Sequence, residues 1–221
     1  MTAAILTLNS KNYGSWSLRG WLLCRLAGLE FTEHIVDSTE PGVQAELLLL
    51  SPSILVPRLE HDGLVVWDTL AIGEYLHELR PDAGLLPSSP ADRARCRSVC
   101  GEMHSGFANL RAALPMNIKA RHRNFKVWAG AQADIDRILT IWSECLLASG
   151  GPYLFGSAPT MADAMFAPVC TRFITYAVDL PPPAAAYVGT ILARPELIEW
   201  TAAAVAEPDG LAGLEPVDVE F

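Results

Sequence analysis

The 221-residue chain has few basic side chains. It carries 16 lysines and arginines against 25 aspartates and glutamates, a formal net charge of −9. Binding to nucleic acids and to anionic membrane surfaces depends largely on positive charge. The shortage of positive charge therefore argues against a nucleic acid or a membrane as a partner.

Cysteine is also scarce, and long apolar segments are missing. The five cysteines include no C-x-x-C pair and are odd in number, which is not the pattern of a disulfide framework. Cys96 and Cys100 lie one helical turn apart, and we interpret them as core thiols, with no metal site. No apolar run is long enough to cross a bilayer and the N-terminus lacks a signal-peptide pattern, so we expect a reducing, cytoplasmic setting.

The first eighty residues alternate strand and helix signals. Asp62-Gly63 is a two-residue turn between apolar runs and predicts an antiparallel hairpin. A helix between the first two strands predicts that they pair in parallel. The chain therefore begins with a mixed four-stranded α/β sheet, with strands expected at Ala3–Leu8, Phe31–Val36, Val56–Leu59 and Leu64–Trp67, and helices at Ser15 to Gly28, Val43–Leu50 and Asp68 to Leu79.

Strand signals disappear after a proline-rich linker. Apolar residues recur at spacings of three and four, which indicates helices, and Trp128 lies on the face that we expect to be buried. Helices are predicted at Ala91–Leu114, Lys126–Ala148, Thr160 to Tyr176, Ala184–Ala193 and Pro195–Ala206, and the tail from Pro208 to Phe221 has no predicted regular structure. We therefore expect a sheet domain at residues 1–80, a linker at 81–90 and an all-helical domain at 91–221.

Four stretches give the chain a resemblance to the cytosolic glutathione transferases. They are Asn12–Arg19 (NYGSWSLR), Ser51–Pro57 (SPSILVP), Trp67–Ile72 (WDTLAI) and Thr160–Asp163 (TMAD), and the last is also a capping-box variant that makes Asp163 a helix cap. Their order and spacing together resemble the serine-type, bacterial members. The resemblance implies a thioredoxin-like first domain, a helical second domain and a homodimer that uses glutathione as co-substrate, without a metal.

The same resemblance implies a thiolate donor at the start of the first helix. Ser15 precedes Arg19 by four positions, the register of the serine-type members, and Tyr13 is the rival in the tyrosine-type register. Ser17 and the indole N–H of Trp16 are weaker candidates. Ser15 or Ser17 is also the predicted N-cap of this helix, and a plain cap is the alternative role for Ser15. We interpret Arg19 as structural.

Glutathione itself would be held by the second and third stretches. The resemblance implies that Asp68 and Thr69 receive the γ-glutamyl end and that the Val56 backbone pairs with the cysteinyl part, beside a cis Pro57. Leu55, together with Ile54, departs from residues that are common in the family.

The second substrate is expected against the first helix of the second domain, with Trp16, Met103, His104, Phe107 and Arg111 as candidate pocket residues. Core packing of Met103 and Phe107 is the alternative. A basic cluster at 121–123 is either a surface loop or a site that attracts anions. We expect a detoxifying glutathione transferase for hydrophobic electrophiles, with a glutathione-dependent isomerase or a non-catalytic binding module as alternatives.

Overall fold

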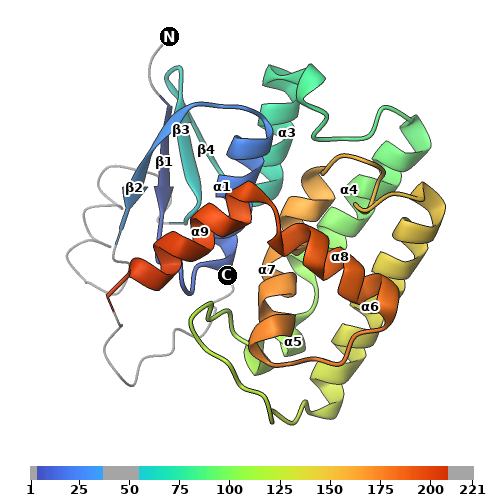
Figure 1. Ribbon diagram of the computed structural model, residues 1–221. Coiled ribbons are helices and arrows are strands. Elements are labelled where there is room, and N and C mark those ends of the chain that lie inside the picture. Colours follow the sequence, from blue (N-terminus) through green and yellow to red (C-terminus); the bar gives the residue numbers. More distant parts are fainter. Residues whose placement is uncertain (1–3, 37–54, 209–221) are drawn as a thin grey trace.

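The computed structural model describes residues 4–36 and 55–208, and it comprises a part with a β-sheet followed by a helical part (Figure 1). Three expectations lie outside the described residues: the helix Val43–Leu50, the stretch Ser51–Ile54 and the tail after Pro208.

The sheet has four strands, β1 (Ala4–Leu8), β2 (Phe31–Ile35), β3 (Arg58–His61) and β4 (Leu64–Trp67), in the order β2-β1-β3-β4. β1 pairs in parallel with β2 and antiparallel with β3, and β3 pairs antiparallel with β4. The prediction of a mixed sheet is confirmed. Helix α1 (Ser15–Leu26) connects the parallel pair and packs against α3 (Thr69–Leu79), which follows β4.

The hairpin strand begins later than predicted. β3 starts at Arg58, whose partner in β4 is Trp67, so Val56 and Pro57 precede the ladder. Proline has no N–H to donate to a neighbouring strand, which accounts for the later start. The turn itself is as expected, because Asp62 and Gly63 both have positive φ, 48° and 81°.

The predicted helix Ala91–Leu114 is wrong, because the chain forms two helices, α4 (Pro90–Ser105) and α5 (Ala108–Ala113). Gly106 is extended between them, and a Cβ there would lie 2.7 Å from the Glu102 carbonyl oxygen. Phe107 follows with a left-handed φ of 65°. The apolar spacing continues across the break and therefore concealed it.

Helix α6 (Ala129–Ser149) also begins after the predicted Lys126, and Trp128 is 51% exposed where we expected burial. A Cβ on Gly130 would lie 2.3 Å from the Trp128 ring. The indole therefore folds over Gly130 at the start of the helix and stays outside the core.

The central element of the helical part is α7 (Met161–Thr175), which is buried along nearly its whole length. It contacts α1, α4 and α8 (Pro182–Leu192), so it joins the sheet part to the helical part. The predicted capping box at its start is confirmed. Helix α9 (Pro195–Ala206) returns across α1 toward the sheet (Figure 1).

All five cysteines are buried and none forms a disulfide. Burial raises the pKa of Cys24 to about 12, so this thiol stays protonated at neutral pH.

We expect an aromatic disulfide reagent to modify almost no thiol in the folded protein at pH 8 within minutes, and all five cysteines in denaturant. The absorbance of the thiolate that the reagent releases measures the number of modified thiols in the folded and in the denatured protein. Rapid modification of the folded protein would contradict the burial of these side chains.

Candidate functional site

The loop from β1 to α1 is tightly held. Glu207, just after α9, accepts hydrogen bonds from Ser10 Oγ (2.7 Å) and from the backbone N–H groups of Lys11 (2.5 Å) and Asn12 (3.1 Å). Sequence patterns did not point to Glu207, because a contact between the two ends of the described chain leaves no local signal.

The N-cap of α1 is Gly14, not Ser15 or Ser17 as expected. A Cβ at Gly14 would lie 2.0 Å from Asn9 Oδ1, so the close turn leaves no room for a side chain. Ser17 donates to Asn9 Oδ1 at 2.6 Å and accepts from the Asn9 N–H at 3.0 Å. Ser17 therefore holds the loop.

Ser15 is the first residue of α1 and is 1% exposed. Its hydroxyl has no hydrogen-bond partner among the described residues, although buried hydroxyls usually have one. Thr69 at the start of α3 is in the same state, 1% exposed with a hydroxyl that has no partner there. Ser15 and Thr69, both candidate site residues, thus each have a buried hydroxyl without a hydrogen-bond partner among the described residues.

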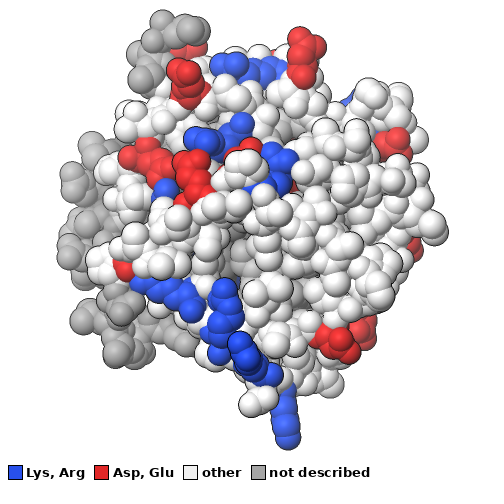
Figure 2. Space-filling model, viewed as in Figure 1, with Lys and Arg blue, Asp and Glu red and all other residues white. Residues whose placement is uncertain are grey.

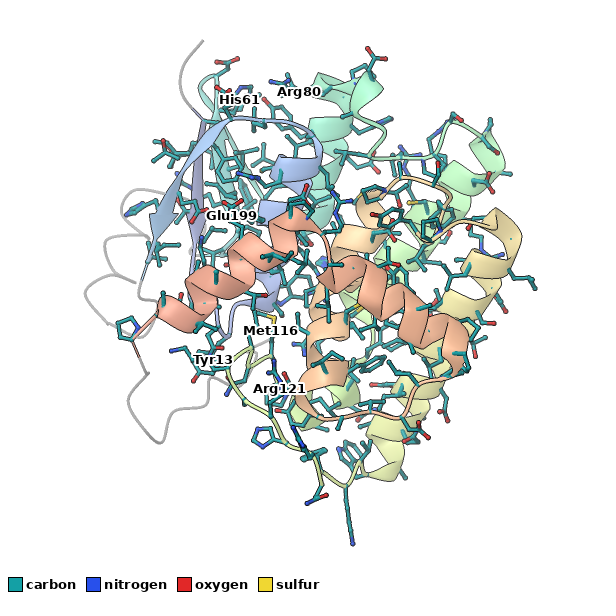
Figure 3. All side chains as sticks on the ribbon, in the orientation of Figure 1. Tyr13, His61, Arg80, Met116, Arg121 and Glu199 are labelled. Atoms are coloured by element: carbon teal, nitrogen blue, oxygen red, sulfur yellow. The ribbon has the colours of Figure 1, made fainter. Side chains whose placement is uncertain are left out.

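Tyr13 is half-buried and lies beside a different segment. Its neighbour Asn12 accepts hydrogen bonds from the N–H groups of Ile118 and Lys119, and Tyr13, Met116 and Arg121 occupy the same region of the view in Figure 3. The phenol and the Ser15 hydroxyl therefore have different surroundings.

The Val56–Pro57 peptide bond is cis, as the resemblance implied. Pro57 packs directly on α1, because a Cβ on Gly20 would lie 2.5 Å from Pro57 Cγ. Val56 is half-buried and Leu55 is 43% exposed. A residue larger than glycine at position 20 would push the Val56–Pro57 segment away from the helix.

Asp68 is the N-cap of α3. Its Oδ1 accepts from the N–H groups of Leu70 (2.8 Å) and Ala71 (3.3 Å), while its φ of 76° is unusual for a residue other than glycine. Its other oxygen, Oδ2, lies 2.7 Å from Nε2 of His104 on α4. Both residues were predicted site residues, but their pairing was missed because it joins distant parts of the chain.

Trp16 is the centre of a cluster between the two parts of the molecule. The guanidinium carbons of Arg19 and Arg111 lie 4.5 and 4.7 Å from its ring centroid, and the His104 ring meets it edge-on at 5.0 Å. Arg19 also donates from Nε to the Met165 carbonyl oxygen at 2.8 Å, in keeping with a structural role.

Only part of the predicted pocket is accessible. Met103, Phe107 and Arg111 are buried, while Trp16 and His104 are half-buried. Arg111 donates to the carbonyl oxygens of Met103 and His104 and so fixes the end of α4. The Arg111 guanidinium is therefore turned toward the main chain at the end of α4 and toward the Trp16 indole.

A run of basic residues follows α5. Arg121, Arg123 and Lys126 are exposed, and Lys and Arg side chains extend along the lower part of the face in Figure 2, where the segment between α5 and α6 passes in Figure 1. His122 stacks on Tyr176 at 5.1 Å. The cluster predicted at 121–123 thus lies on the surface, near Tyr13.

A hollow of about 450 Å³ lies elsewhere, between the end of α1, β2 and the start of α9, lined by residues that include Arg25, Glu33 and Glu196. It contains none of the predicted site residues. Within residues 4–36 and 55–208, no group of three metal-ligating side chains is close enough to hold an ion, and no helix has the length and hydropathy of a membrane span.

Sequence profiles match in two places: the glutathione S-transferase N-terminal domain over residues 13–79 and the corresponding C-terminal domain over residues 105–203. Maleylacetoacetate isomerase of Rattus norvegicus is 31% identical over 171 residues, which cover 76% of this chain and 77% of that protein.

Two solved structures are also similar. A glutathione transferase from Methylococcus capsulatus has a TM-score of 0.69 at 26% identity, over 92% of this chain and 99% of that one. Maleylacetoacetate isomerase from Anaeromyxobacter dehalogenans, with glutathione bound in its active site, has a TM-score of 0.65 at 26% identity. The match covers 95% of this chain and 99% of that one. With both domain profiles matched in order and these relatives covered over most of their length, the chain belongs to the glutathione S-transferase family.

Proposed function

We propose that the chain is a glutathione transferase that activates the glutathione thiol for attack on a hydrophobic electrophile. The observation that carries this proposal is the buried Ser15 hydroxyl, which has no partner among the described residues and stands at the N-terminal end of α1. A homodimer, a cytoplasmic location and a role in detoxification belong to the same proposal.

The chemistry requires a thiolate. A free thiol has a pKa of about 8.5 and is mostly protonated at neutral pH. Lowering that pKa by two units takes about 2.7 kcal/mol of preferential stabilisation of the anion. One hydrogen bond from Ser15 together with the partial positive charge of the α1 N-terminus can supply that amount.

Glutathione would be oriented by the segments around Pro57 and at the start of α3. The Val56 backbone would pair with the cysteinyl part, held in place by the Pro57 contact with Gly20. Asp68 would receive the γ-glutamyl ammonium, and Thr69 would receive its carboxylate through its hydroxyl and its backbone N–H at the start of α3.

The sulfur then forms a bond to the electrophilic carbon, and the leaving group departs with the electron pair. Trp16, a half-buried member of the predicted pocket, would face the second substrate, whereas the His104 ring is turned toward Asp68. Met103, Phe107 and Arg111 would shape that site from behind.

A glutathione-dependent isomerase is the second candidate, favoured by the names of the relatives and by the exposed basic run at Arg121 and Arg123. The thiolate would add to one carbon of a cis double bond, the new single bond would rotate, and the thiolate would leave again to give the trans product. A carboxylate on the substrate would be attracted by the basic side chains.

The test combines retention on immobilised glutathione with two assays, conjugation of a generic aryl halide and isomerisation of a cis-unsaturated dicarboxylic acid. We expect retention and glutathione-dependent conjugation. Retention with isomerisation alone would establish the second candidate. Retention without turnover would support a non-catalytic binding module, the alternative suggested by Leu55, which departs from residues common in the family. No retention at all would refute the proposal.

A further inference from the structure

His104 reaches from the helical part into the glutathione site proposed above. It is in the last turn of α4, and its Nε2 lies 2.7 Å from Oδ2 of Asp68. The side chains are 29% and 36% exposed, so a ligand has access to both.

Asp68 needs support from outside its own helix. Its positive φ places a non-glycine residue in a conformation that persists only when surrounding contacts determine it. Oδ1 is fixed by the two N–H groups of α3, and the His104 imidazole fixes Oδ2 from the opposite side. With both oxygens held, the carboxylate plane has one orientation.

His104 is itself held in three directions. The Trp16 ring packs against its edge, Asp68 accepts from its Nε2, and Arg111 donates to its carbonyl oxygen at 3.2 Å. The imidazole therefore links α1 to the start of α3, and the main chain at His104 is tied to α5.

We propose that His104 is the positioning residue for Asp68, so that α4 determines how tightly the enzyme holds the γ-glutamyl group of glutathione. This inference rests on the proposed function. A preset carboxylate needs no rearrangement when it receives the ammonium group, and loss of that orientation weakens binding. The effect is on glutathione affinity and not on the attack by sulfur.

The test measures the Kd of glutathione by calorimetry and kcat at saturating glutathione. His104→Leu removes the hydrogen-bond donor to Asp68. We expect the Kd of glutathione to rise about three- to tenfold, the effect of losing a partly exposed charged hydrogen bond, while kcat stays within about twofold of the wild type. His104→Gln keeps an N–H donor and should restore most of the affinity.

Arg97→Gln is the matched control, because it breaks the bond between Arg97 of α4 and Glu74 of α3 without touching Asp68. We expect an unchanged Kd. Equal Kd values for His104→Leu and the wild type would overturn the inference, as would an equal loss in Arg97→Gln or a failure of His104→Gln to restore binding. If the wild type itself does not bind glutathione, the proposed function fails first.

Discussion

Ser15→Ala should lower kcat/KM for conjugation by at least about tenfold, because a charge-assisted hydrogen bond to a thiolate is worth about 1.5–3 kcal/mol. The fold should stay intact, since the Ser15 hydroxyl has no hydrogen-bond partner among the described residues and its loss breaks no bond there. Initial rates with a chromogenic aryl halide, together with a circular dichroism spectrum, measure both effects.

Tyr13→Phe is the companion variant, because it removes the rival hydroxyl and nothing else. Tyr13 lies beside the segment that contains Met116 and Arg121, so we expect a rate within about twofold of the wild type. A normal rate in Ser15→Ala with a large loss in Tyr13→Phe would transfer the donor role to the phenol. A pH–rate profile of Ser15→Ala should also show the thiol ionising at higher pH than in the wild type.

Asp163→Ala should cost about 3–5 kcal/mol of folding free energy, because it leaves several buried donors without an acceptor. Asp163 is buried and accepts from Thr160 N (2.7 Å), Thr160 Oγ1 (3.0 Å), Leu154 N (3.1 Å) and Tyr187 Oη (3.1 Å). Burial raises the pKa of Asp163, while the bonds from Thr160 and Leu154 act in the opposite direction. Thermal unfolding should show a Tm lower by roughly 10 °C.

Ser89→Ala provides the comparison, since Ser89 caps α4 at the surface through a single contact of 3.4 Å to the Asp92 N–H. A cap of this kind is worth about 1 kcal/mol. A loss in Asp163→Ala no greater than that in Ser89→Ala would show that the buried network does not stabilise α7.

The sequence was informative wherever a residue type dictates local geometry. Asp62-Gly63 determined the hairpin turn, and Thr160 with Asp163 determined the start of α7. The mixed sheet followed from the order of the elements. Each of these features depends on residues that are close together in the chain.

The prediction failed where the apolar spacing gives no sign of a break in a helix, and where a contact joins distant parts of the chain. Gly106 and Phe107 break a helix whose apolar spacing continues unchanged, and Trp128 folds back over Gly130. In the candidate site, Asp68 and His104 were both found, yet only the folded chain brings them together. The burial of Met103 and Phe107 was an open alternative, since a helical spacing cannot tell a core from a pocket wall.

Several residues in the first turns of α1 have different structural or candidate functional roles at neighbouring positions. Ser15 presents the candidate donor, Trp16 and Arg19 join the sheet part to the helical part, and Gly20 receives Pro57. A rotation of this helix by a fraction of a turn would shift all four positions at once. A substitution in this stretch therefore disturbs the contacts between the two parts of the molecule, whereas the segment around Arg121 and Arg123 is exposed and can vary without moving α1.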